Sequence, residues 1–190
     1  MPDRGLIIEK LPSEEGLQEL LVTDEERCRA AGFGSQRRRA EYLAWRSIVR
    51  RELGPDVEIG YTDEGAPVLL NRSEHIGVSH SADFVAVVIS DSRCAVDIER
   101  LSRNFTGISS RYITASERQL SVDPRFEAAV WCAKETLYKY ARRTGLDFLE
   151  DIRILKVDFE AGIIVGSILG GDSVEMRMTS YGDNTVVWVG

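Results

Sequence analysis

The chain has 190 residues, of which 43% are hydrophobic and 29% charged, and its formal net charge at pH 7 is −7. These values fit a soluble globular protein of one domain or two small lobes, and the acidic balance argues against a general nucleic-acid binder. Apolar runs are too short to cross a bilayer, the start Met1-Pro2-Asp3-Arg4 is no secretory signal, and three scattered cysteines form no CxxC pair, so we expect a cytoplasmic protein with reduced thiols.

The first part of the chain predicts two helices followed by strands. Thr23 and Glu26 form a capping box before a short helix that Gly32 ends. Ser35 can cap a second helix over 36–53, which carries an apolar stripe. Strands are expected near 57–62, 67–70, 76–79 and 84–89.

The second predicted helix is rich in arginine. Arginines outnumber lysines 20 to 4, and six of them lie within 15 residues that contain a single acid, Glu41. The planar guanidinium group suits phosphate oxygens, but a solvated helix face gives the same pattern. The segment alone leaves both interpretations open. The six are Arg37, Arg38, Arg39, Arg46, Arg50 and Arg51.

Asp97 and Glu99 lie two residues apart in an apolar run that predicts the next strand. Strand residues two apart share a face, so both carboxylates should point the same way and the apolar neighbours the other way. Buried carboxylates need a partner or a metal ion. The alternative is that both acids face solvent or arginines such as Arg100 and Arg103.

Thr114 and Glu117 form a second capping box, on a short helix. Asp123-Pro124 should open the longest helix of the chain, which runs to about Arg143. Strands near 152–159, 162–169, 173–180 and 184–189 complete the chain.

Glu135 and Lys139 are four residues apart on this last helix and therefore lie on the same side. A surface ion pair is the simple interpretation. Against it, Lys134 and Lys139 are two of only four lysines, and the helix also carries several aromatic residues. Three acids and a lysine brought together would suit a divalent cation and a phosphate-bearing substrate.

Ser79 and His80 end an apolar strand and could contact phosphate, whereas a turn histidine without function is the alternative. A Ser–His nucleophile is disfavoured, because adjacent strand residues point to opposite faces and no Gly-x-Ser-x-Gly elbow is present. With two histidines and no cysteine pattern, a zinc site has little support.

Each half of the chain contains a long helix followed by mostly antiparallel strands. We therefore predict an α+β fold of two similar lobes, 1–95 and 96–190, that meet near residues 92–100. The halves share no close sequence identity, so duplication is a structural hypothesis.

Three segments, taken in order, resemble the 4′-phosphopantetheinyl transferase superfamily, and within it the larger, single-chain, surfactin-synthetase-activating type. The family patterns are (I/V)SHS, G-(I/V)-D-(I/V)-E and W-x-x-K-E-(S/A)-x-x-K. The likeness covers roughly residues 24–145, and three ordered motifs are far more specific than a lone Asp-x-Glu. The segments are Gly-Val-Ser-His-Ser (77–81), Ala-Val-Asp-Ile-Glu (95–99) and Trp-Cys-Ala-Lys-Glu-Thr-Leu-Tyr-Lys (131–139).

The resemblance implies a pseudo-twofold fold and a Mg²⁺-dependent enzyme. Such an enzyme transfers the 4′-phosphopantetheine group of coenzyme A to a serine of an apo acyl, peptidyl or aryl carrier protein and releases adenosine 3′,5′-bisphosphate. Carriers of this kind serve fatty-acid, polyketide or nonribosomal peptide synthesis. The N-terminal lobe would form the side that binds the coenzyme A phosphates, and the C-terminal lobe would carry the metal-binding and catalytic helix.

Site roles carry over residue by residue. Asp97, Glu99 and Glu135 would bind Mg²⁺. Glu135, directly or through a metal-bound water, would also accept the serine proton, and Lys139 would contact the reacting phosphates. The nucleotide phosphates would be bound by Ser79, His80, Arg37 and Arg38.

Two positions depart from the family patterns. Ala95 replaces a glycine that is not a ligand, which is a mild change. Ala66 replaces the lysine of Gly-Lys-Pro, which reaches the coenzyme A phosphates in the family. That contact is therefore missing here, or an arginine such as Arg37 or Arg72 supplies it.

Chain length predicts whether the site is built within one chain or between subunits. Short holo-carrier-protein synthases place the Asp motif near the N-terminus and build each site between subunits. Here 96 residues precede Asp97, so one chain should hold a complete site between its lobes as a monomer.

A non-catalytic coenzyme A or carrier-binding module is the main alternative to the transferase function. A Mg²⁺-dependent nuclease is less favoured, since its acid and lysine usually lie two apart on one strand.

Overall fold

The computed structural model describes residues 5–190, so the polar start at residues 1–4 lies outside the described residues. Within them the helices are α1 (Asp24–Ala31), α2 (Gln36–Leu53) and α3 (Phe126–Ala141), with short 3₁₀ helices η1 (Glu15–Glu19), η2 (Thr106–Arg111) and η3 (Glu117–Gln119). The strands are β1 (Leu6–Lys10), β2 (Ile59–Tyr61), β3 (Pro67–Leu69), β4 (His75–His80), β5 (Phe84–Ser90), β6 (Ala95–Arg100), β7 (Ile152–Asp158), β8 (Ile163–Ile168), β9 (Ser173–Tyr181) and β10 (Asn184–Val189).

The described strands form three antiparallel sheets, ordered β1-β5-β4, β2-β3 and β6-β10-β9-β8-β7. This mixture of helices and antiparallel sheets confirms the α+β part of the predicted fold class. None of the helices in residues 5–190 is both long and apolar enough to cross a membrane.

The first two helices begin at the capping residues that the sequence predicts. The Thr23 hydroxyl accepts the Glu26 backbone N–H, and the Glu26 carboxylate accepts that of Thr23, which closes the capping box of α1. The Ser35 side chain accepts the Arg38 backbone N–H at the start of α2. Each contact satisfies a backbone donor that the first helical turn would otherwise leave open.

Helix α3 is shorter than predicted. It has 16 residues against 18 in α2, so the prediction that it is the longest helix was wrong. Asp123 does not open it, because the Asp123 carboxylate binds the backbone N–H of Arg125 and forms a turn there. The reciprocal Thr114–Glu117 contacts exist, but they precede a 3₁₀ helix of only three residues.

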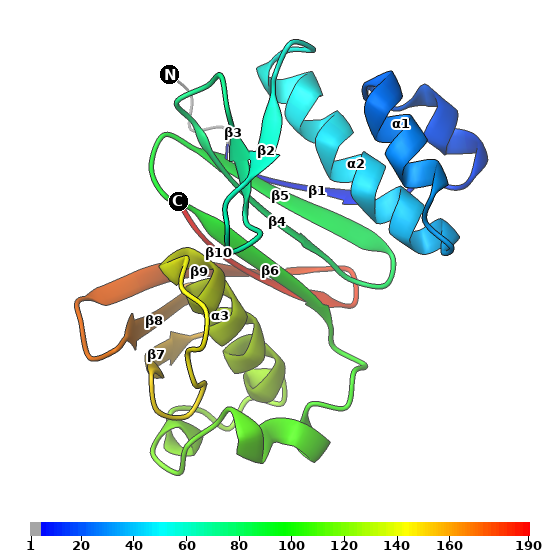
Figure 1. Ribbon diagram of the computed structural model, residues 1–190. Coiled ribbons are helices and arrows are strands. Elements are labelled where there is room, and N and C mark those ends of the chain that lie inside the picture. The colour runs from blue at the N-terminus through cyan, green and yellow to red at the C-terminus, as the bar shows by residue number, and fades with distance from the viewer. Residues whose placement is uncertain (1–4) are drawn as a thin grey trace.

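Helix α2 packs on one face of the β1-β5-β4 sheet (Figure 1). Ala86 and Val88 on the opposite face of β5 pack against Val96, Ile98 and Val186 of the next sheet. The middle of the molecule is therefore a layer of two facing sheets. The contact of α2 is made by Ala44, Trp45, Ile48 and Val49 against Val85, Val87 and Ile89.

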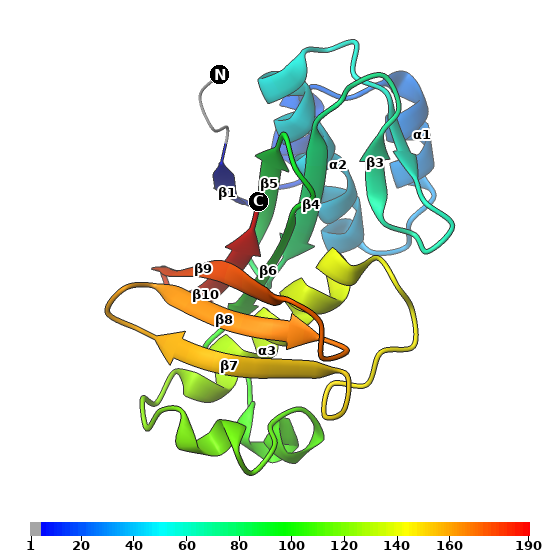
Figure 2. The ribbon, with the colours of Figure 1, turned by 90° about the vertical axis from the view of Figure 1, so that its left-hand side faces the viewer.

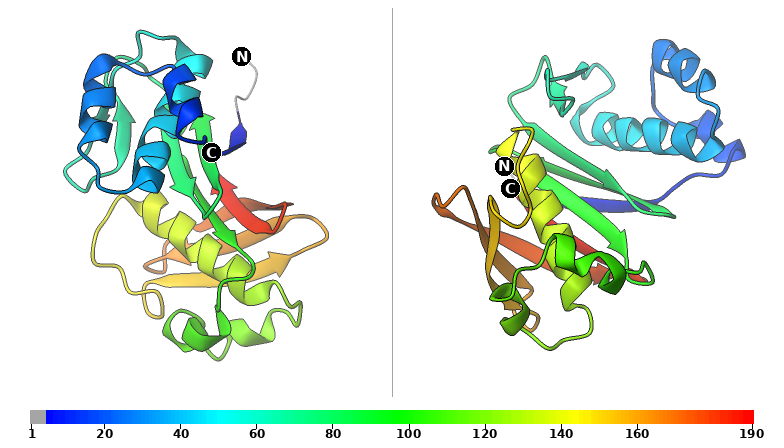
Figure 3. Two further views of the ribbon diagram at one scale, coloured as in Figure 1. Left: turned by 90° about the vertical axis from the view of Figure 1, so that its right-hand side faces the viewer. Right: turned by 60° about the horizontal axis from the view of Figure 1, so that its bottom comes forward.

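Helix α3 packs against the five-stranded sheet (Figures 1 and 2). The short helices η2 and η3 lie near the start of α3 (Figure 3). The largest hydrophobic cluster among residues 5–190 lies here, and its fully buried members include Ala129, Cys132, Leu137, Ile164 and Met176.

The β1-β5-β4 sheet meets the five-stranded sheet where β4 passes β6. A Cβ atom on Gly77 would lie 2.8 Å from the Cα atom of Ala95, so only glycine allows this approach. Each of these two sheets packs against a long helix, but their strand numbers differ. The pseudo-twofold relation and the division at residue 95 stay predictions.

Candidate active site

Strand β6 turns its two acids toward helix α3. The Asp97 Oδ1 atom lies 2.7 Å from Lys139 Nζ, and Glu99 Oε1 accepts the Trp131 indole N–H at 3.0 Å. Both partners lie on α3, whereas the intervening Ile98 packs toward the β1-β5-β4 sheet. The alternation predicted from the sequence is therefore confirmed.

Asp97 is buried, with 5% of its surface exposed, and its two oxygens differ. Oδ1 accepts hydrogen bonds from Ser79 Oγ at 2.8 Å and from Lys139 Nζ at 2.7 Å. Oδ2 is buried and has no hydrogen-bond partner among residues 5–190. An unpaired buried carboxylate oxygen is costly, which makes this atom a natural contact for a cation.

Glu99 is held by two donors on its Oε1 atom, the Trp131 indole and the guanidinium group of Arg103. Burial raises the pKa of Glu99, as does the nearby Asp97 carboxylate, while Arg103 opposes the shift. One of the two arginines considered from the sequence, Arg103, is thus a real partner. The other, Arg100, pairs with Asp83 instead.

Glu135 makes no hydrogen bond or ion pair with another side chain of residues 5–190, so the simple Glu135–Lys139 surface pair is wrong for this structure. Lys139 turns away from it and donates to Asp97 Oδ1, to Ser79 Oγ at 3.1 Å and to the Val96 carbonyl at 3.0 Å. Burial, followed by repulsion from Asp97, raises the pKa of Glu135. Glu135 is therefore a carboxylate whose affinity for a proton or a cation is increased.

A cleft of about 620 Å³ brings most of the predicted site residues together. Its opposite wall is aromatic and basic, and includes Tyr42, Trp45 and Tyr61. Arg37 is not among the lining residues. The predicted site residues that do line the cleft are Arg38, Ser79, His80, Asp97, Glu99, Glu135 and Lys139.

Glu41, which the sequence did not single out as a site residue, also lines this cleft. Its Oε1 atom accepts the Arg37 Nε–H at 2.7 Å and lies 3.3 Å from His80 Nδ1. Burial lowers the pKa of His80, and Glu41 opposes that shift. The Arg38 guanidinium group stacks 4.9 Å from the centre of the Phe33 ring.

Lys134, the other lysine of the α3 motif, lies outside the cleft. Its side chain is fully buried and lies 2.8 Å from Glu117 Oε1. It also donates to the carbonyl oxygens of Phe148 at 2.6 Å and Ile152 at 2.8 Å. Lys134 therefore joins α3 to the segments around it and does not reach the cleft.

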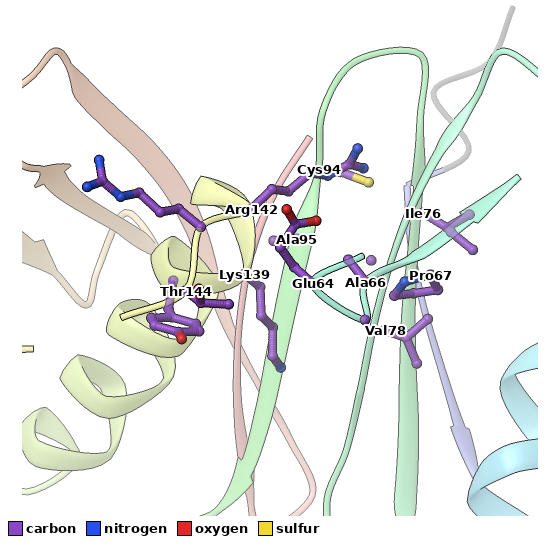
Figure 4. Close-up of a pocket in the computed structure, with 14 residues that line it drawn as sticks. Glu64, Ala66, Pro67, Ile76, Val78, Cys94, Ala95, Lys139, Arg142 and Thr144 are labelled. Carbon is purple, nitrogen blue, oxygen red and sulfur yellow. The ribbon is translucent and has the colours of Figure 1, made fainter. Parts of the chain in front are cut away.

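A second pocket of about 290 Å³ adjoins the cleft and shares Pro67, Val78 and Lys139 with it. Figure 4 shows Ala66 and Pro67 on one side of this pocket and Lys139 on the other. Arg142, just beyond α3, also lines it.

Arg142 was missed by the sequence analysis, which considered Arg37 and Arg72 as substitutes for a lysine at position 66. In the structure Arg72 binds Asp56 at the surface, at 2.7 Å, and Arg37 is engaged by Glu41. The basic pair at the end of α3, Arg142 and Arg143, was the signal available in the sequence.

The three acids do not form a ready-made metal centre. Among residues 5–190 no group of three or more His, Cys, Asp and Glu side chains is placed to hold a metal ion. Instead, one carboxylate oxygen of Asp97 and one of Glu99 accept hydrogen bonds from other side chains of the protein. The chemistry of the set still fits Mg²⁺, which prefers carboxylate oxygens. Asp97 Oδ2 has no partner among the described residues, and burial, followed by repulsion from Asp97, raises the pKa of Glu99 and of Glu135, so a bound cation would stabilise their charged forms. The shared magnesium site stays a prediction.

Residues 93–174 match the family model described as the 4′-phosphopantetheinyl transferase superfamily. This segment is similar to that superfamily. It contains strand β6 and helix α3, and therefore Asp97, Glu99, Glu135 and Lys139. No curated protein matches the chain. The assignment to the larger, single-chain type stays a prediction.

Proposed function

We propose that this protein transfers the 4′-phosphopantetheine group of coenzyme A to a serine of an apo carrier protein and releases adenosine 3′,5′-bisphosphate. One observation carries the proposal. The matched segment supplies Asp97, Glu99, Glu135 and Lys139, and these line one cleft with Ser79 and His80 of the N-terminal lobe. The partners would be coenzyme A and a carrier protein of the cytoplasm.

Asp97, Glu99 and Glu135 are the residues that would hold Mg²⁺. The chemistry that Mg²⁺ supplies when bound is stabilisation of charge on the diphosphate oxygens. Arg103 and Trp131 fix one oxygen of Glu99, while Ser79 and Lys139 fix one oxygen of Asp97.

Glu135 is the residue proposed to take the proton from the attacking serine. A general base works best when its pKa lies near the working pH, and burial shifts the pKa of Glu135 in that direction. Lys139 lies between β6 and the cleft, where its ammonium group would contact the reacting phosphates.

Arg142 is proposed to supply the positive charge that Ala66 lacks. Both residues line the pocket beside the cleft, and Lys139 lies in the wall between the two cavities. A guanidinium group at the rim of this pocket would contact a phosphate of coenzyme A that extends from the cleft.

The test mixes the protein with coenzyme A, Mg²⁺ and a set of apo carrier proteins, and records the intact mass of each carrier. We expect the mass increment of one phosphopantetheine group on at least one carrier, and none with Glu135→Gln. If coenzyme A binds and no carrier gains mass, the second candidate function stands instead. That function, a non-catalytic coenzyme A or carrier-binding module, is favoured by Ala66 and by the lack of a preformed metal group among the described residues.

The complete site is proposed to lie within one chain, because α2, β4, β6 and α3 of the same chain all contribute lining residues to the cleft. We therefore propose a monomer. Light scattering coupled to gel filtration checks this, and a trimer in which each site needs a neighbour would contradict it.

A further inference from the structure

Glu41 places a negative charge where the proposed function requires anion binding. Its side chain is 14% exposed and lies on α2, between Arg37 and His80. A carboxylate beside a phosphate site repels the ligand, so its presence there needs a physical reason.

The reason is that Glu41 contacts one particular nitrogen of the His80 ring. Glu41 lies at Nδ1, so Nε2, at the other edge of the ring, is left for the cleft that both residues line. The other charged groups that act on the ring are Lys139 of α3, Arg37 of α2 and Asp97 of β6. Burial is the largest influence and lowers the pKa of His80, which favours the neutral ring, and 47% of the side chain is exposed.

A neutral imidazole carries one N–H, and the hydrogen bond made by one nitrogen decides where that proton lies. The Glu41 carboxylate can only accept, so its position 3.3 Å from Nδ1 favours the tautomer with the proton on that nitrogen. Nε2 then carries a lone pair and cannot donate to an anion until the ring gains a second proton.

We propose that Glu41 is a positioning residue that holds His80 in its Nδ1–H form and lets the ring take up a proton at Nε2 when a phosphate binds. The inference rests on the proposed function, because it takes the ligand to be a phosphate ester. In the bound state the imidazolium donates from Nδ1 to Glu41 and from Nε2 to a phosphate oxygen. One proton is taken from solvent for each ligand bound, and the Glu41 charge stabilises the imidazolium.

Nitrogen NMR of the histidine rings tests the first step without turnover or metal. The chain has only two histidines, and His75, which lies 3.5 Å from Arg142 through its Nδ1, is the internal control. We expect His80 to carry its proton on Nδ1 in the wild type and to move toward the Nε2–H form in Glu41→Ala, with His75 unchanged. A wild-type His80 that carries its proton on Nε2 overturns the proposal.

Calorimetry with adenosine 3′,5′-bisphosphate, in two buffers of different ionisation enthalpy, tests the second step. We expect uptake of close to one proton in the wild type at neutral pH and about tenfold weaker binding in Glu41→Ala, the range for a lost charge-assisted hydrogen bond. Glu52→Gln, on the same helix, removes the same charge as a control and should leave binding unchanged.

Two further variants keep the test decisive. In Glu41→Gln the amide oxygen still accepts from Nδ1, so we expect the Nδ1–H form to persist with reduced proton uptake. In a His80→Ala background, Glu41→Ala should add little, because Glu41 acts through the ring. An equal loss in both backgrounds would show that Glu41 acts on Arg37 instead and would overturn the proposal. Failure of transfer, with these results intact, would count against the proposed function alone.

Discussion

Lys134 and Glu117 form a buried ion pair that joins helix α3 to the segment before it. The Lys134 side chain is 0% exposed and that of Glu117 2%, with Nζ and Oε1 2.8 Å apart. The ammonium group has three donors, and Glu117, the Phe148 carbonyl and the Ile152 carbonyl satisfy them. One lysine of the α3 motif is therefore structural, whereas Lys139 reaches the cleft.

Substitution separates the two roles. Lys134→Met should lower the free energy of unfolding by about 3–5 kcal/mol, because it leaves the Glu117 carboxylate buried without its counter-ion. Lys139→Gln should lose transfer activity with a smaller change in stability, because Lys139 is one-third exposed. Urea unfolding and the carrier mass assay measure the two quantities. Adding Glu117→Gln to Lys134→Met should recover part of the lost stability, and no recovery would contradict the ion-pair account.

The same pair predicts how stability depends on pH. Burial alone would raise the pKa of Glu117, but hydrogen bonds from Lys134 and from the backbone of Thr114 and Ile154 outweigh it and lower the pKa. A carboxyl whose pKa falls on folding stabilises the protein above its unfolded value of about 4.3, and that contribution is lost as pH falls through the lower, folded value.

We therefore expect the melting temperature of the wild type to fall on acidification below about pH 4.3 more steeply than that of Glu117→Gln. Thermal unfolding of both proteins across this pH range measures the difference. Parallel curves would show that Glu117 does not carry the effect.

Sequence patterns predicted those features that depend on local geometry. The orientation of Asp97 and Glu99 follows from the two-residue period of a strand, and the α1 cap follows from Thr23 and Glu26. Strand β1 was not predicted. It forms by pairing along its whole length with β5, about 80 residues later, and no pattern within five residues reveals such a partner.

The missed parts of the site depend on contacts between distant segments. Glu135 and Lys139 suggested a local pair, but Lys139 binds Asp97, 42 residues earlier, because β6 lies against α3. The side chains of Lys134 and Lys139 point in directions about 140° apart around the helix axis. Only the packing of α3 shows which of these directions faces the core. Arg142 joins the site because the β2-β3 hairpin lies across the end of α3.

Gly77 is expected to be intolerant of a side chain. In Gly77→Ala the new Cβ would lie 2.8 Å from both the Ala95 Cα and a methyl group of Val88, and backbone at the seam of two sheets cannot move aside. We expect a loss of about 1–3 kcal/mol in the free energy of unfolding. Gly34→Ala is the control, because nothing lies within 4 Å of its added Cβ atom. Equal urea midpoints for the two variants would contradict the close approach of β4 and β6.

Arg142→Gln should raise the KM for coenzyme A about tenfold and leave kcat nearly unchanged, because it removes a binding charge outside the reacting centre. Arg72→Gln is the control, since Arg72 binds Asp56 at the surface. Adding Ala66→Lys to Arg142→Gln should restore the KM, because the two positions line one pocket. A rise in KM for Arg72→Gln without one for Arg142→Gln would show that Arg72, and not Arg142, contacts the phosphate.

Glu135 and Cys132 lie three residues apart on α3 and should respond in opposite ways to substitution. Glu135→Gln should reduce transfer by about 10²–10⁴-fold, the range for loss of a general base, without loss of stability, because it relieves repulsion from Asp97. Cys132→Ala should keep its activity, since the thiol is fully buried and burial raises its pKa well above the usual value, which makes it a poor nucleophile.

The wild-type rate should also rise with pH as Glu135 deprotonates, because a general base acts in its deprotonated form. Initial rates from the carrier mass assay, with thermal unfolding of each variant, measure these effects. An inactive, folded Cys132→Ala beside an active Glu135→Gln would move the chemistry from the carboxylate to the thiol, which the burial of Cys132 makes physically unfavourable.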